Sequence, residues 1–163
     1  MQGSAVDTKP RGPEYFLLGL ELGLIGGGDV LSWVESCIEA DAKPAGWLVD
    51  LAYLGPTDVA DMISILRRAA SKFDSWTVIR ELVFDLPASR TETVEACVAI
   101  VSGLYRIWVE HDCEAPADFD DLPHLEDGYK LAKAGIHGTV PEWHLAVRGF
   151  LRAVSRSTAR GSH

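Results

Sequence analysis

Apolar residues recur at helical spacing along most of the chain, and this pattern predicts its elements. In "PTDVADMISILRRAASK" the apolar positions that share one helical face are Val59, Met62, Ile63, Leu66 and Ala70. Pro56 suits the first turn of this helix, and Asp58 and Asp61 lie near the positive end of its dipole. The stretch is therefore predicted to form an amphipathic helix.

Two further helices are predicted from capping-box spacing at their starts. Ser89 and Glu92 stand three residues apart in "SRTE", ahead of an apolar stripe that continues to Trp108. Thr139 and Glu142 have the same spacing in "TVPE", ahead of a stripe that ends at Val154.

Shorter apolar patterns predict the remaining helices. One is capped by Asp29, one contains Trp76 and is stopped by Pro87, and two cover residues 47–54 and 125–134. No series of alternating β-branched runs and no Asn-Gly hairpin signal occurs. The fold class expected from these patterns is all-α, a single-domain bundle of about seven to eight helices.

The stretch "LGLELGLIGGGDVLSW", residues 18–33, contains three consecutive glycines that resemble a nucleotide-binding loop. A dinucleotide fingerprint that starts at Gly26 meets Leu31 where a third glycine or alanine is needed. If the fingerprint starts at Gly23, Ile25 occupies the second glycine position. A P-loop is not predicted either, because the lysine that this motif requires is missing. The residues before the glycines fit both an alternating strand and a helix. We interpret the glycines as a hinge between two helices, before Asp29.

Composition indicates one globular domain. The chain has 163 residues, of which 47% are apolar and 24% charged. We expect a flexible arm at residues 1–12, a helical domain at 13–158 and a flexible tail at 159–163 that resembles a tag remnant. The three cysteines, Cys37, Cys97 and Cys113, show no paired spacing, which favours the cytoplasm. The longest apolar stretch is too short to span a bilayer, so no membrane association is expected.

Candidate chemistry is sparse. A metal site is one hypothesis, and its ligands would be His111, Asp112, Cys113 and His124. Such a site would make the protein a metal-dependent enzyme or a small-ligand-binding protein. An EF-hand calcium loop that begins at Asp118 is not predicted, because Pro123 occupies the sixth position, where glycine is required. No catalytic residue and no cofactor is predicted, and the question of enzymatic activity stays open.

Charge is distributed unevenly along the chain. Residues 107–129 carry a net charge of −8, residues 130–160 carry +5, and the whole chain carries −9. The acidic residues of the first segment are Glu110, Asp112, Glu114, Asp118, Asp120, Asp121, Glu126 and Asp127. In one interpretation this segment lies against Arg148, Arg152 and Arg156 of the last helix. In the other it binds a basic protein partner, since concentrated charge steers association. The negative net charge of the whole chain disfavours direct binding to nucleic acid.

The segments "YFLLGLELGLI" and "VLSWVESCIEA" resemble the start of small, uncharacterised all-helical bacterial proteins of the immunity-protein type. The resemblance covers about the first forty residues and transfers no site residue. It implies a bacterial, non-enzymatic protein of a type that neutralises a toxin. Together with the acidic segment, it leads to the hypothesis of a module that occludes a basic toxin or effector surface. A structural subunit of a helical homo-oligomer, such as a homodimer, is a further hypothesis.

Overall fold

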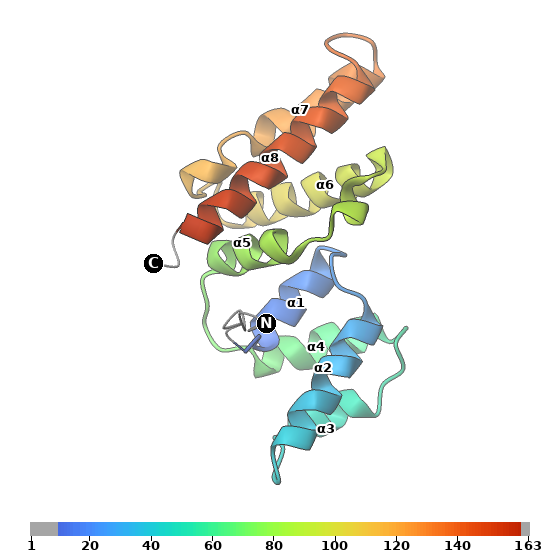
Figure 1. The fold of residues 1–163 in the computed structure, drawn as a ribbon, viewed down its shortest axis with the longest axis vertical. Coiled ribbons are helices and arrows are strands. Elements are labelled where there is room, and N and C mark those ends of the chain that lie inside the picture. Colours follow the sequence, from blue (N-terminus) through green and yellow to red (C-terminus); the bar gives the residue numbers. More distant parts are fainter. Residues whose placement is uncertain (1–9, 161–163) are drawn as a thin grey trace, which may run out of the picture.

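The computed structural model describes residues 10–160, which contain eight α-helices, two short 3-10 helices and no strand (Figure 1). The helices are α1 (Pro13–Glu21), α2 (Gly27–Ala40), α3 (Gly46–Ala52), α4 (Val59–Ala69), α5 (Ser75–Asp85), η1 (Ala88–Thr91), α6 (Val94–Glu110), η2 (Ala117–Phe119), α7 (Leu122–Lys133) and α8 (Val140–Arg160). The all-α class and the expected number of helices are confirmed. Within the same residues, no helix combines the length and the apolar character needed to cross a bilayer.

The helices are arranged around two clusters of buried apolar side chains that meet at α1. Helices α2, α3 and α4 surround one cluster, and α5, α6, α7 and α8 surround the other (Figure 1). Phe16, Leu17 and Leu20 belong to the first cluster, whereas Leu18 and Leu22 belong to the second. Helix α1 is therefore buried on two faces, which explains why its sequence is apolar nearly all round.

The glycine run lies between two helices, and it opens α2. Gly26 is the N-cap of α2, and its N–H donates to the Asp29 carboxylate at 2.9 Å. Asp29 is thus inside the first turn, and its prediction as the N-cap was wrong. A Cβ atom on Gly27 would lie 2.0 Å from the carbonyl oxygen of Pro56. The glycine is needed there because another backbone approaches closely.

The two predicted capping boxes have opposite outcomes. Thr139 and Glu142 cap α8 reciprocally: the Thr139 N–H donates to the Glu142 carboxylate at 2.9 Å, and the Glu142 N–H donates to Thr139 Oγ1 at 3.3 Å. The prediction for Ser89 and Glu92 was wrong, because these residues belong to the turn around η1. Thr93 is the N-cap of α6 and accepts from the Ala96 N–H at 3.2 Å.

Other boundaries differ from the expectation by a few residues. Pro56 lies in the turn before α4, where Asp58 is the N-cap, and α7 begins at Leu122 rather than Leu125. The part of the expected N-terminal arm at residues 1–9 lies outside the described residues, as do residues 161–163 of the expected tail. Arg11 is described and forms ion pairs with Glu81 and Asp85 of α5, each at 2.6 Å.

Candidate functional site

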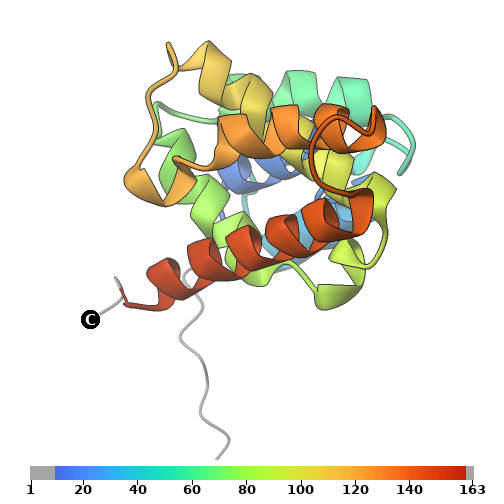
Figure 2. The same cartoon turned by 90° about the horizontal axis from the view of Figure 1, so that it is seen from above.

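The acidic segment connects α6 to α7 at one edge of the bundle, where Figure 2 shows it in gold and orange. Helix α6 ends in a tight turn in which the Cys113 N–H donates to the Trp108 carbonyl at 3.0 Å. Asp112 and Cys113 have φ angles of 54° and 63°. Residues other than glycine rarely adopt this left-handed conformation, and two in succession are unusual. The turn directs the chain back towards α5.

Three contacts fix the segment to α5. The Phe119 side chain is fully buried and its ring lies 4.7 Å from that of Trp76, centroid to centroid. The Trp76 Nε1–H donates to the Glu114 carbonyl oxygen at 3.2 Å. Asp118 accepts two hydrogen bonds from Arg80, from Nε at 2.8 Å and from Nη2 at 2.6 Å. The segment is therefore anchored at both of its halves.

The Asp118 carboxylate is a structural group. Its side chain is only 17% exposed, and it also accepts a hydrogen bond from Ser157 Oγ of α8 at 2.9 Å. Hydrogen bonds from Arg80 hold the pKa of Asp118 below its usual range, against the opposing effect of burial. Asp118 thus stays ionised while it links η2 to α5 and α8.

Two other acidic residues of the segment also have partners within the chain. Glu126 is 15% exposed, lies 3.2 Å from Lys130 Nζ and accepts from Ser102 Oγ at 3.0 Å. Glu110 lies 3.9 Å from Arg106, and both side chains are exposed. A solvated pair at this distance contributes little to stability.

Five carboxylates along the segment are exposed, and none forms an ion pair or a side-chain hydrogen bond with the rest of residues 10–160. They are Asp112, Glu114, Asp120, Asp121 and Asp127, and together they are called the acidic surface here. Electrostatically, it can attract a cationic group without first breaking an internal ion pair.

The last helix contacts the acidic segment but does not neutralise it through an ion pair in the described residues. Helix α8 approaches η2, where Ser157 donates to Asp118. In the described part of the chain, Arg148, Arg152 and Arg156 form no ion pair. The cation that pairs with the segment in η2 is Arg80, which the sequence reasoning missed. Its partner lies 38 residues away, so no local pattern could have indicated it.

The four residues of the metal hypothesis are not brought together. Nowhere in residues 10–160 do three or more His, Cys, Asp or Glu side chains lie close enough to hold one ion. The His111 ring faces Trp76, with 6.1 Å between the ring centroids, and Cys113 is exposed. His124 instead lines a hollow between α7 and α8, which His137 also lines. The geometry gives this hypothesis no ligand set.

Cys97 is not placed for nucleophilic catalysis. Cys97 is fully buried, and burial raises the pKa of its thiol, which the nearby Arg148 offsets only in part. Cys37 is half-buried on α2. A buried thiol with a raised pKa is a poor nucleophile at neutral pH.

No protein-family model, curated protein or solved structure gives a significant match to this chain. The resemblance of the first forty residues to immunity-type proteins therefore stays a prediction.

Proposed function

We propose that this protein is a non-enzymatic binding module whose acidic surface engages a basic protein partner. The observation that carries the proposal is the set of five exposed carboxylates that have no cation of their own within the described residues. Concentrated charge of one sign raises the rate of encounter with a partner of opposite sign and selects against partners of like sign.

Anchoring of the segment supports the same proposal. Phe119, Asp118 and the Glu114 carbonyl are held by α5, so Glu114 itself and the adjacent Asp120 and Asp121 are carried on a backbone that is held in place. A binding segment that is already ordered loses less conformational entropy when a partner binds. This favours recognition of one defined surface over loose attraction of any cation.

The mechanism proposed is occlusion. The module would cover a basic working surface, such as that of a toxin or effector that acts on nucleic acid, and would perform no chemistry. We place it in the bacterial cytoplasm, where an inhibitor of this kind meets its target before damage occurs. The net charge of −9 is unfavourable for direct binding to nucleic acid.

The proposal is tested by affinity capture with three tagged baits. One is the wild-type chain, and one carries Asp112→Lys, Asp120→Lys and Asp121→Lys. The control carries Glu35→Lys, Glu39→Lys and Asp50→Lys, which are exposed acids of α2 and α3 with no ion pair in the described chain. Asp118 is left unchanged, because reversing its charge would break the contact with Arg80 and disturb the fold.

We expect one basic protein to be captured by the wild type and by the control, and to be lost with the variant of the acidic surface. Equal capture by all three baits would show that the partner binds elsewhere. Capture of no basic protein by the wild type would also contradict the proposal.

A further inference from the structure

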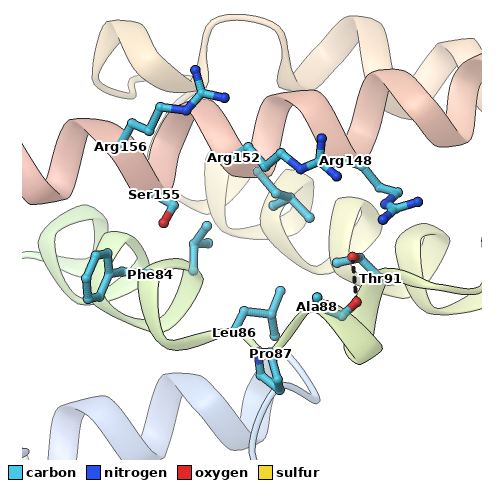
Figure 3. Close-up of a pocket in the computed structure, with 11 residues that line it drawn as sticks. Phe84, Leu86, Pro87, Ala88, Thr91, Arg148, Arg152, Ser155 and Arg156 are labelled. Carbon is cyan, nitrogen blue, oxygen red and sulfur yellow. Dashed lines mark hydrogen bonds between the residues drawn. The ribbon is translucent and has the colours of Figure 1, made fainter.

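A groove of about 350 Å³ lies between α8 and the end of α5, separate from the acidic surface. Its walls come from α5, the link to η1, and α8, as Figure 3 shows. Most of the side chains that line it are cationic or apolar, and Thr91 and Ser155 add two hydroxyl groups. No residue of the acidic segment lines it. It is called the arginine groove here.

The cationic side is a row of three arginines, Arg148, Arg152 and Arg156, which follow one another along α8 (Figure 3). A spacing of four residues in a helix separates them by about 6 Å each, so the row extends over about 12 Å. None of them forms an ion pair in residues 10–160. Figure 3 shows Arg148 extending towards η1 and Arg156 extending away from α5, so the uncompensated positive charge is spread along α8 beside the groove.

The acidic side chains of α5 and α8 are engaged elsewhere, whereas Glu92, which follows the groove residue Thr91, is exposed and forms no ion pair in the described residues. Glu81 and Asp85 of α5 both bind Arg11, and Asp85 also accepts from the Tyr15 hydroxyl at 2.7 Å. Glu142, the acidic residue of α8, is occupied by its capping contact with Thr139. The arginines are thus available to a ligand without the loss of an internal partner.

The opposite side of the groove is apolar. Leu86 extends towards α8 across it, Pro87 and Ala88 follow in the link to α6, and Phe84 lies at the end nearer Arg156 (Figure 3). Phe84 is 49% exposed, which is high for a side chain of its size. A ligand that fills the groove therefore needs apolar groups as well as negative charge.

We infer that the arginine groove binds a short acidic peptide segment of a protein partner, with apolar side chains between its carboxylates. Carboxylates on alternate residues of an extended peptide lie about 7 Å apart, which matches the arginine spacing. Arginine binds carboxylates through two parallel hydrogen bonds, and the apolar wall would receive the intervening side chains. This site takes a partner of opposite charge to the one proposed for the acidic surface.

A nucleic-acid strand fits the groove less well. Its phosphates continue far beyond a 12 Å row, and the chain as a whole carries a charge of −9. A peptide of a few residues, by contrast, is about as long as the row of arginines. Stacking of successive bases would require several aromatic side chains, and Phe84 is the one aromatic residue among those that line the groove.

The test selects ligands from a phage-displayed pool of random 12-residue peptides on the immobilised wild-type protein. The strongest peptides are then synthesised, and their dissociation constants are measured with wild type and two variants. One variant carries Arg152→Glu and Arg156→Glu, which changes two exposed side chains of the groove. The control carries Arg68→Glu and Lys72→Glu, exposed cations near the end of α4 with no ion pair in the described residues.

We expect the selected peptides to be enriched in Asp or Glu alternating with Leu, Ile or Phe. Their affinity should fall at least tenfold with the groove variant and stay within twofold with the control. Phe84→Ala should weaken these peptides more than it weakens a peptide of glutamates alone. Circular dichroism melting checks that each variant is folded. Peptide binding should persist when the acidic surface is reversed, so that failure of the two proposals is distinguishable.

Several results would overturn the inference. One is a selection without enrichment of acidic residues, and another is equal binding of the peptides to wild type and groove variant. Tighter, arginine-dependent binding of a twelve-nucleotide thymidine strand would assign the groove to nucleic acid instead. Self-association in light scattering that is lost with the groove variant would assign it to a second copy of the chain.

Discussion

Arg80 of α5 and Asp118 of η2 are joined by two hydrogen bonds, of 2.8 Å from Nε and 2.6 Å from Nη2. The two residues are 38 positions apart in the sequence, so their contact closes the loop that carries the first half of the acidic surface. Ser157 of α8 adds a third hydrogen bond to the same carboxylate. The partly buried Asp118 carboxylate thereby holds the backbone on which the exposed carboxylates of the acidic surface are carried.

Replacement of Asp118 by Asn should therefore destabilise the fold. It removes the charge from a paired, partly buried group, and we expect the free energy of unfolding to fall by about 1–2 kcal/mol. Urea unfolding followed by circular dichroism measures the change. Asp120→Asn, at an exposed neighbouring position without a side-chain partner in the described chain, should change it by less than about 0.5 kcal/mol. Equal effects of both substitutions would show that the contact with Arg80 has no structural role.

The same pair predicts a pH dependence. Because hydrogen bonds from Arg80 lower the pKa of Asp118 in the folded state, the unfolded chain binds more protons in acid. The stabilisation is complete above the unfolded pKa of about 3.9 and is lost as pH falls through the lowered folded value. The difference in unfolding free energy between wild type and Asp118→Asn should be constant near neutral pH and shrink below about pH 4. A difference that grows on acidification would reverse the sign of this argument.

Gly27 and Gly28, successive residues in the first turn of α2, should respond oppositely to alanine. A Cβ on Gly27 would collide with the Pro56 carbonyl, whereas a Cβ on Gly28 would meet nothing within 4 Å. We expect Gly27→Ala to destabilise by about 2–3 kcal/mol, since the obstacle is backbone. Gly28→Ala should be neutral or stabilise by up to about 1 kcal/mol. Thermal melting of both variants distinguishes them, and tolerance of Gly27→Ala would refute the close approach of the α3–α4 turn.

Asp74 should act as an N-cap for α5. Its carboxylate accepts from the Trp76 N–H at 3.3 Å and from the Thr77 N–H at 3.1 Å. Asp74→Ala should lower the free energy of unfolding by about 1 kcal/mol, and Asp74→Asn or Asp74→Ser by less, because both retain an acceptor. Chemical denaturation of the three variants gives the order. If Asn and Ser were as harmful as Ala, capping would not explain the effect.

The parts of the fold that could be predicted are those encoded within a few residues. The Thr139–Glu142 box is such a case, because both partners lie in one turn and act on each other. Ser89 and Glu92 have the same spacing, yet Thr93 directly follows them and is an equally good cap. Local pattern alone does not decide between two adjacent caps.

The site needed information that the sequence does not carry locally. The eight acidic residues of the segment can be read from the sequence, but whether each is paired depends on tertiary contacts. Asp118 meets Arg80, whereas Asp120 and Asp121 beside it meet no cation in the described residues. The four-residue spacing of Arg148, Arg152 and Arg156 can be read from the sequence, whereas the apolar wall opposite them is formed by α5, the link to η1 and η1 itself. Only the folded chain brings these surfaces together.

The most direct test is a titration of the purified captured partner against wild type, the acidic-surface variant (Asp112→Lys, Asp120→Lys, Asp121→Lys) and the α2–α3 control (Glu35→Lys, Glu39→Lys, Asp50→Lys), at low salt and at physiological salt. Exposed charges are screened over about 8 Å at physiological ionic strength, so the electrostatic share of the affinity should be larger at low salt. We predict that the acidic-surface variant loses at least tenfold in affinity and most of the salt dependence, while the control behaves as wild type. Equal affinities for all three proteins, or a loss shared by the control, would contradict recognition through the acidic surface.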